Sequence, residues 1–216
     1  LVRVDIDKPG DKAGWYVFHL GEVSAGAFGN WRTDLNEKWC SKDRREMSDA
    51  ESAEYARIAA TSKAQREALK IELQAAAKAK AVEIWESAQP ADPAHPYFVK
   101  KRLSAHSIRH HGDKLLVDMR NESGQTWALQ TIDTDGRKLF QPKGCRTQGL
   151  FHQIGNHPAP GDYIGVVEGW ATGAAIYEAT GWPVACAMSA GNLEEVARIV
   201  TGLFHNNRGV LWSDDD

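Results

Sequence analysis

The chain has 216 residues, of which 42% are hydrophobic and 25% charged, and its formal net charge is −3. No apolar run approaches the roughly 20 residues of a membrane helix, and residues 1–9 do not build a signal peptide, so we expect an ordinary cytoplasmic protein of one large domain or two small ones. Three widely spaced cysteines, Cys40, Cys145 and Cys186, exclude a disulfide framework and a four-cysteine zinc site.

The net charge argues against a strongly basic nucleic-acid binder, but the charge is unevenly distributed along the chain. Residues 1–96 contain 14 basic and 16 acidic residues, residues 97–148 contain 10 and 5, and residues 149–216 contain 2 and 8. A basic segment followed by an acidic one is the pattern expected of a polyanion-binding surface beside a cation-binding site. Surface charge scattered by chance is the alternative.

The first part of the chain, up to residue 42, has the pattern of β structure. Val2, Val4 and Ile6 alternate with charged residues, and residues 15–20 form an aromatic and β-branched run. We therefore expect short strands in this region.

A long helix is predicted next, because the sequence changes at Ser48 to a stretch rich in Ala, Lys, Glu, Gln and Arg. Ser48 and Glu51 form the S-x-x-E pattern of a capping box, which places the helix from about residue 49 to residue 87. Large apolar residues are few along it, so we expect a connecting arm rather than a core element.

Prolines at positions 90, 93 and 96 end the predicted helix, and a short helical turn follows them. The sequence after this turn again favours β-strands. The predicted strands are residues 114–119, 126–133 and 137–142, joined by turns at residues 121–124 and 135–136. Much of the basic excess therefore lies on a sheet and its turns.

From Tyr163 the pattern alternates strand, helix, strand, helix and strand. The predicted elements are residues 164–167, 171–179, 184–188, 192–204 and 209–213. Short continuous apolar strands separated by helices predict a parallel sheet that is covered on both faces.

Acidic residues follow two strands of this predicted sheet. Glu168 comes directly after Val167, and Asp214 and Asp216 follow the last strand. Functional groups gather beyond the carboxyl ends of parallel strands, and Mg²⁺ is bound by one or two carboxylates together with waters and phosphates. The three carboxylates therefore predict a Mg²⁺ site. The alternative is that Glu168 stabilises the start of the next helix and that the aspartates are solvated charges.

Several motifs occur in a fixed order along the chain. They are Glu168-Gly169, Thr172-Gly173, residues 178–181, residues 190–193 and residues 214–216, preceded by motifs at residues 15–17, 25–32, 95–97, 130–140 and 149–152. The later group resembles the Toprim domain of phage and plasmid primases, including primase-helicases. The earlier group resembles the segment that precedes Toprim in these proteins, so the resemblance covers nearly the whole chain.

The resemblance implies an α+β N-terminal region with a long helix, followed by an α/β Toprim-like domain with a parallel sheet. It implies a DNA primase, a nucleotidyltransferase that synthesises short RNA primers for DNA replication with Mg²⁺, or alternatively Mn²⁺. Glu168, Asp214 and Asp216 would be its catalytic and metal-binding residues. The partners implied are single-stranded DNA template, ribonucleoside triphosphates and a replicative helicase, fused or separate.

Seven residues of the basic segment are candidates for contacts to phosphates of nucleic acid or nucleotide. They are Lys138, Lys143, Arg146, Arg137, Lys100, Lys101 and Arg102. The first three are the strongest candidates because they cluster next to the start of the predicted parallel sheet. Trp127 and Phe140 are candidate stacking platforms for bases, with solvated lysines and a core tryptophan as the alternative interpretation.

The predicted organisation has four parts. They are an N-terminal β region at residues 1–47, a connecting helix at 48–89, a basic β-rich subdomain at 90–160 and a truncated Toprim domain at 161–216. The chain begins without Met and stops after the Asp-x-Asp motif, so we expect a fragment of a longer protein. Two other functions remain open, a Toprim nuclease and a non-catalytic DNA-binding or replisome-docking module.

Overall fold

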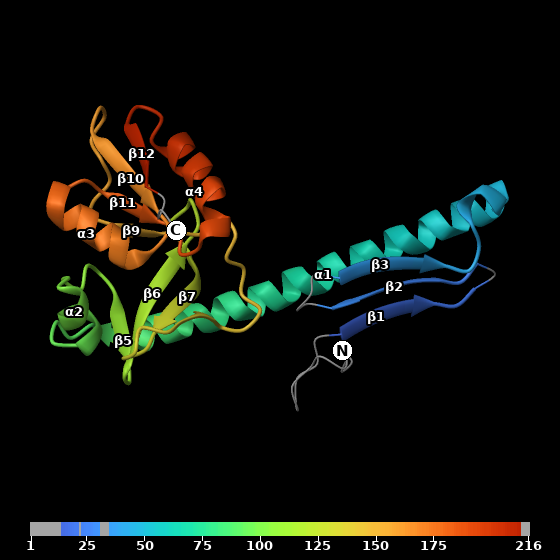
Figure 1. The fold of residues 1–216 in the computed structure, drawn as a ribbon, viewed down its shortest axis with the longest axis horizontal. Coiled ribbons are helices and arrows are strands. Elements are labelled where there is room, and N and C mark those ends of the chain that lie inside the picture. The colour runs from blue at the N-terminus through green and yellow to red at the C-terminus, as the bar shows by residue number, and fades with distance from the viewer. Residues whose placement is uncertain (1–13, 22, 31–34, 213–216) are drawn as a thin grey trace. The chain divides into compact units, whose positions relative to one another are not determined.

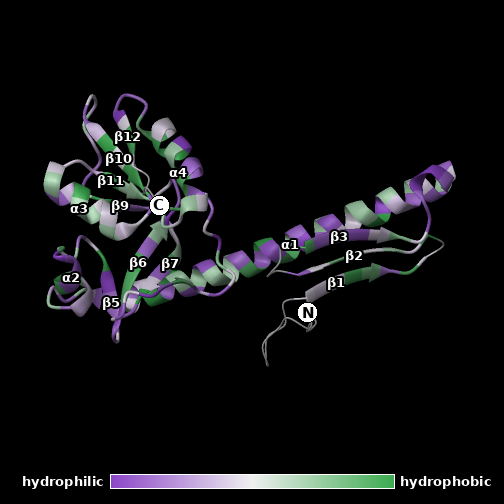
Figure 2. Cartoon of the chain, in the orientation of Figure 1, coloured by the Kyte–Doolittle hydropathy of each residue, from purple (hydrophilic) through white to green (hydrophobic). Residues whose placement is uncertain are grey.

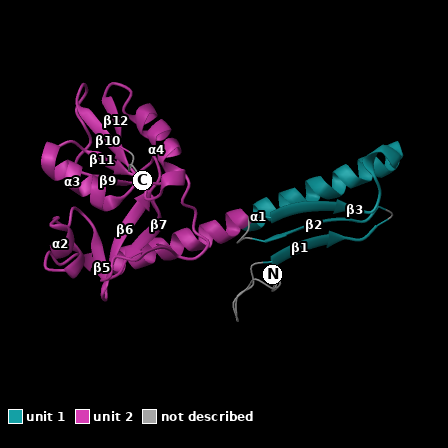
Figure 3. Ribbon diagram, viewed as in Figure 1, with its two compact units in different colours: residues 1–69 teal, residues 70–216 magenta. Residues whose placement is uncertain are grey.

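The structure, a computed structural model, describes residues 14–21, 23–30 and 35–212. These residues form an α+β fold with both parallel and antiparallel strand pairs (Figure 1). They divide into two compact units, which we call unit 1 (residues 1–69) and unit 2 (residues 70–216) (Figure 3). Within the described ranges, every helix is too short or too polar to cross a lipid bilayer.

Unit 1 contains a three-stranded antiparallel sheet in the order β1-β2-β3. Its strands are β1 (Gly14–His19), β2 (Ala25–Asn30) and β3 (Leu35–Cys40), followed by a short 3-10 helix, η1 (Arg44–Glu46). The β pattern predicted for residues 15–20 is confirmed, whereas Val2, Val4 and Ile6 lie outside the described residues.

Two glycines of β2 make room for aromatic rings from the neighbouring strands. Gly29 pairs with Trp15, and a Cβ at Gly29 would lie 2.6 Å from the Trp15 ring. Gly26 lies between Phe18 and Trp39, whose rings stack at 5.4 Å between centroids. Because successive residues point to opposite faces, these two ring arrangements lie on opposite sides of the sheet.

Helix α1 (Asp49–Ser87) has the predicted bounds. Its capping box is formed, because the Ser48 backbone N–H donates to Glu51 Oε2 at 2.8 Å and the Glu51 N–H donates to Ser48 Oγ at 3.3 Å. Purple, hydrophilic bands recur along the helix in Figure 2. Its buried residues are Ala77, Ala81 and Trp85, so only its last part, in unit 2, packs into a core.

Unit 2 begins with an antiparallel sheet in the order β4-β5-β6-β7-β8. Its elements are β4 (Gln89–Pro90), α2 (Pro96–Lys101), β5 (Arg109–His111), β6 (Lys114–Arg120), β7 (Thr126–Ile132) and β8 (Lys138–Gln141). The three strands predicted here are confirmed to within two residues. On one face of this sheet Leu116 and Leu129 pack with Ala81 and Trp85 of α1.

The rest of unit 2 forms a mixed four-stranded sheet in the order β12-β10-β11-β9. Its elements are β9 (His152–Ile154), β10 (Tyr163–Val167), α3 (Trp170–Thr180), β11 (Val184–Cys186), α4 (Ala190–Leu203) and β12 (Arg208–Trp212). Strand β10 pairs in parallel with β11 and β12, whereas β9 adds an antiparallel edge that the sequence pattern did not predict.

Both faces of the mixed sheet are covered by helices. Ile164 and Val166 of β10 pack in the same cluster as Val196 of α4, while Val167 belongs to the cluster that contains Trp170 of α3. This alternation is the period of a strand that is buried on both sides. Helix α3 approaches closely at Gly173, where a Cβ would collide with Cys186 Sγ.

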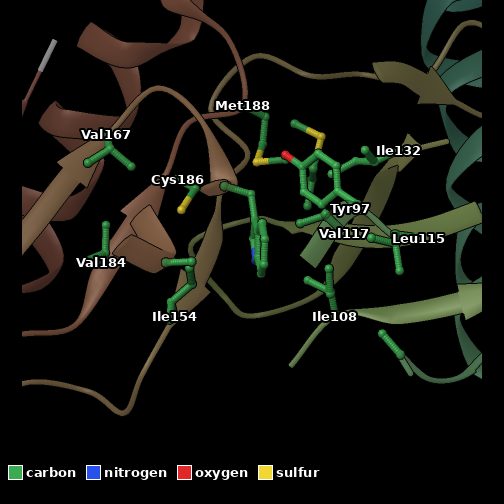
Figure 4. Close-up of a cluster of buried hydrophobic side chains, with 14 of the residues drawn as sticks. Tyr97, Ile108, Leu115, Val117, Ile132, Ile154, Val167, Val184, Cys186 and Met188 are labelled. Carbon is green, nitrogen blue, oxygen red and sulfur yellow. The ribbon is translucent and has the colours of Figure 1, made fainter. Parts of the chain in front are cut away.

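One hydrophobic cluster joins the two sheets of unit 2 (Figure 4). It contains side chains of the antiparallel sheet, of the mixed sheet and of α2. Labelled members are Tyr97, Ile108, Leu115, Val117, Ile132, Ile154, Val167, Val184, Cys186 and Met188. Because residues from 91 to 188 share this cluster, the antiparallel sheet and the parallel strands of the mixed sheet are held next to each other.

Candidate functional site

Glu168 lies at the carboxyl end of β10, in the turn that leads into α3. Its backbone oxygen accepts a hydrogen bond from the Met188 N–H at 2.6 Å, and the Val167 oxygen accepts one from the Ala187 N–H at 2.8 Å. The chain therefore stays tied to the segment after β11 beyond the end of regular pairing. The Glu168 side chain is half-buried, and it precedes the N-terminus of α3, an end that favours negative charge.

Strand register places the end of β12 beside the end of β10. Val167 pairs with Cys186 of β11 on one side and with Trp212 of β12 on the other. Parallel neighbours lie about 4.8 Å apart, so Trp212, at the end of β12, lies next to Val167. Asp214 and Asp216 lie outside the described residues, and within the described ones no three His, Cys, Asp or Glu side chains gather as a metal site.

Lys138 is the predicted basic residue that the structure brings to this edge. Its Nζ lies 3.7 Å from the position that a Cβ on Gly169 would take, directly after Glu168. Burial raises the pKa of the nearby Cys186 thiol well above its ordinary value, and the charge of Lys138 opposes that rise only weakly. Cys186 is therefore a protonated core residue, and Lys138 is an exposed cation beside the carboxylate turn.

Arg146 lies between the antiparallel sheet and α4. Its guanidinium carbon is 4.9 Å from the centroid of the Trp127 ring, and its Nε donates to the Gln148 oxygen at 2.9 Å. Lys78 of α1 places its Nζ 4.4 Å from the same ring centroid. Two cations thus already lie against the Trp127 ring, which leaves less of it for stacking with a base. Phe140, the other candidate platform, is partly exposed on β8.

The remaining basic candidates are exposed. Arg137 and Lys143 flank β8, while Lys100, Lys101 and Arg102 lie at the end of α2. Helix α2 is anchored next to the candidate edge, because its Tyr97 and Phe98 rings lie 6.3 and 5.8 Å from Trp170, the first residue of α3. The short helix thus holds three cations on the part of unit 2 that also holds the Glu168 turn.

Asn192 organises this edge in a way that sequence patterns did not reveal. Its side chain accepts from the Gly149 N–H at 2.7 Å and donates to the Leu150 and Ala187 oxygens, each at 2.8 Å. Asn192 is buried in the first turn of α4. It therefore ties the end of the basic segment to the exit of β11, through partners that lie up to 43 residues away.

Sequence patterns also did not predict a second buried polar group, which surrounds Asp118 on β6. Asp118 is fully buried, its Oδ1 lies 2.8 Å from Nδ1 of buried His152, and its other oxygen accepts from Arg120. Burial alone would raise the pKa of Asp118, but the hydrogen bond and charge of His152 and then Arg120 outweigh it, so the pKa lies below its ordinary value. The group links β6 to β9 and leaves an ionised carboxylate inside the protein.

The two sheets of unit 2 belong to an α+β fold in which the Glu168 turn, at the end of a parallel strand, lies beside an antiparallel sheet that carries Lys138. No known protein-family model matches the chain. The chain is 33% identical to DNA primase TraC of Escherichia coli over 225 residues, which is 100% of this chain and 20% of that protein. A second Escherichia coli DNA primase TraC is 30% identical over 220 residues, or 100% of this chain and 15% of that protein. The chain thus spans a fifth or less of the length of these relatives.

Two solved structures show limited similarity to the chain. The primase fragment of the bacteriophage T7 primase-helicase protein is similar with a TM-score of 0.42 and 16% identity, over 55% of this chain and 54% of that chain. A chain in the structure of bacteriophage T7 lagging-strand DNA polymerase interacting with primase domains is similar with a TM-score of 0.41 and 17% identity, over 55% of this chain and 65% of that chain.

Proposed function

We propose that this chain is the Toprim-containing part of a DNA primase, which joins ribonucleotides into short RNA primers on single-stranded DNA. The observation that carries the proposal is the similarity of the whole chain to DNA primase TraC. In the reaction the primer 3′ oxygen bonds to the α-phosphorus of a ribonucleoside triphosphate and pyrophosphate leaves. The division into residues 1–47, 48–89, 90–160 and a Toprim domain at 161–216, and a cytoplasmic location, belong to the same proposal.

Glu168, Asp214 and Asp216 are the proposed ligands of Mg²⁺, or alternatively Mn²⁺. The proposal is supported by the hard carboxylate oxygens of these residues and by the register of Val167 with Trp212, which places the ends of β10 and β12 side by side. Bound there, Mg²⁺ would activate the 3′-hydroxyl and neutralise charge on the triphosphate. Glu168 itself would accept the proton of the attacking hydroxyl, because it is the carboxylate nearest the strand end.

The basic residues would position the substrates. Lys138 is the proposed contact to the triphosphate, since its Nζ lies beside the Glu168-Gly169 turn. Arg137, Lys143 and Arg146 are proposed contacts to template phosphates, with Lys100, Lys101 and Arg102 extending this surface along α2. A replicative helicase, fused or separate, is the proposed partner that would supply single-stranded template.

A primer-synthesis assay tests the proposal. The protein and its Glu168→Gln variant are given single-stranded DNA, ribonucleotides and Mg²⁺, and labelled RNA products are measured. We expect Glu168→Gln to lower product formation by about 100-fold or more, because it removes a proton acceptor and a metal ligand while keeping the shape. Glu194→Gln is the matched control, since Glu194 is an exposed carboxylate on α4, and it should retain full activity.

The two other functions are outcomes of the same assay. Template cleavage that depends on Glu168 would identify a Toprim nuclease. Binding of DNA by the intact protein, without product or cleavage, would identify a non-catalytic docking module.

A further inference from the structure

A cavity of about 670 Å³ lies within unit 1, between one face of its sheet and the first part of α1. Ligand sites in proteins commonly have volumes of about 300–1,000 Å³. His19 lines the cavity and joins its two walls, because its Nε2 lies 2.9 Å from Ser62 Oγ on α1. No residue of the cavity belongs to the candidate site at the parallel strands, so it requires a separate explanation.

Every charged side chain among the described residues that line this cavity is positive. They are Lys38 of β3, Arg44 of η1, and Lys63 and Arg66 of α1. The composition of unit 1 does not explain this, because residues 1–69 contain 11 basic and 12 acidic residues. Four cations around one space repel one another unless an anion joins them.

The four lining cations also differ in their partners from Lys42 and Arg57 of unit 1. Lys42 and Arg57, which do not line the cavity, pair with Glu51 at 2.8 Å and with Glu54 at 2.7 Å. No carboxylate of the described part of the chain pairs with any of the four lining cations. All four residues are exposed, the Arg66 Nε–H donates to the Ser62 oxygen, and Arg44 approaches the Tyr55 ring.

The walls between these cations are aromatic and apolar. Trp15 is fixed on the sheet by its position over Gly29, and Tyr55 of α1 carries the Arg44 guanidinium 5.3 Å from its ring centroid. Ala27 and Ile58 complete the apolar surface. A ligand that satisfies both features has a flat ring to lie against the aromatic side chains and negative charge to meet the cations.

We propose that this cavity binds a nucleotide, with its base along Trp15 and its phosphates at the four cations. The shared chemistry is that of a free nucleotide and of a nucleotide within a single strand. The site is independent of primer synthesis, because it needs neither Glu168 nor the acidic segment after β12.

The test follows the indole N–H signal of Trp15 by NMR during titration of the protein with ATP in the presence of a chelator of divalent ions. Trp15→Phe assigns the signal. The informative variant is Lys63→Gln/Arg66→Gln, and the matched control is Lys42→Gln/Arg57→Gln, which removes the same charge from the same unit. We expect the first pair to weaken binding by about tenfold or more and the control by less than about twofold.

Further ligands distinguish the sources of the nucleotide. Tighter binding of ATP than of a short single-stranded oligodeoxynucleotide supports a free nucleotide, and the reverse order supports a nucleotide within a strand. Inorganic triphosphate that binds as tightly as ATP would overturn the role of the aromatic walls. Equal losses in both double variants, or no shift of the Trp15 signal with any nucleotide, would overturn the site.

Two controls keep the result interpretable. The Trp39 indole signal, from the opposite face of the same sheet, must be unchanged in the free double variants, which shows that unit 1 is still folded. Glu168→Gln should leave nucleotide binding in the cavity unchanged while it lowers primer synthesis by about 100-fold or more. Failure of the proposed primase activity and failure of this site are therefore separate outcomes.

Discussion

Units 1 and 2 bury their side chains to different extents. All three hydrophobic clusters found among the described residues lie in unit 2, where Trp170, Phe98 and Leu115 are almost completely buried. In unit 1 large aromatic side chains remain exposed, with Tyr16 at 64% and Trp39 at 45%. Apolar burial is the main favourable term in folding, so unit 2 has its own source of stability, while unit 1 relies more on strand pairing and ring contacts.

This difference suits different tasks. A well-packed interior keeps the ends of β10, β11 and β12 in fixed register, as the proposed metal-binding edge would require. An open sheet with small residues leaves space for a ligand between strand and helix, as the cavity of unit 1 does. The comparison also predicts that equivalent substitutions will have unequal effects in the two units.

The largest contrast is expected between two tryptophans. Trp170→Ala should lower the free energy of unfolding by about 3–5 kcal/mol, because it leaves a cavity where the ring now packs against Tyr97 and Phe98. Trp39→Ala, at a half-exposed ring of unit 1, should cost less than about 1 kcal/mol. Urea denaturation followed by circular dichroism measures both, and equal losses would contradict the comparison.

Asn192 and Asn36 give the next contrast. Asn192→Ala should cost about 3 kcal/mol, because it removes three buried hydrogen bonds worth about 1 kcal/mol each. Asn36→Ala, at an exposed position on β3, should change stability by no more than about 0.5 kcal/mol. A small effect at Asn192 would mean that the segment at residues 149–150 does not depend on α4 for its position.

Helix α1 and the strand–helix alternation after Tyr163 were predictable because their signals are local. The capping box at Ser48 is read within four residues, and continuous apolar runs mark β10 and β12. Strand β9 was missed because three residues, His152 to Ile154, are too few to show a period. Their place at the sheet edge depends on pairing with β11 some 30 residues later.

In the candidate site, too, some features follow from the local sequence and others depend on contacts between distant residues. The position of Glu168 at a strand end followed from the apolar run before it, whereas the approach of Lys138 depends on how two sheets pack through one core. Leu150 lies 42 residues from Asn192 and His152 lies 34 residues from Asp118, and no local motif predicts either pairing. Asp214 and Asp216 stay predictions.

Acidification tests whether Asp118, the buried carboxylate of unit 2, is ionised in the folded protein. The pKa of Asp118 lies below its ordinary value in the folded protein, so its contribution to stability is present above about pH 4 and is lost as the pH falls through the lowered pKa. Asp118→Asn removes that contribution. We expect the difference in unfolding free energy between the two proteins to be largest near neutral pH and to shrink as the solution is acidified below pH 4. Parallel pH curves would contradict an ionised Asp118.

Glu51 of unit 1 is the partly exposed counterpart of Asp118, and its substitution should have the smallest effect. Hydrogen bonds from Lys42 and then Ser48 lower the pKa of Glu51 from 4.5 to about 2, so the sign is the same as for Asp118. NMR titration of the carboxyl carbon should give that low midpoint, and Lys42→Gln should raise it. Water screens this pair, so Glu51→Gln should change global unfolding far less than Asp118→Asn does. A comparable loss would show that the cap of α1 supports the whole chain and that the two units are not stabilised separately.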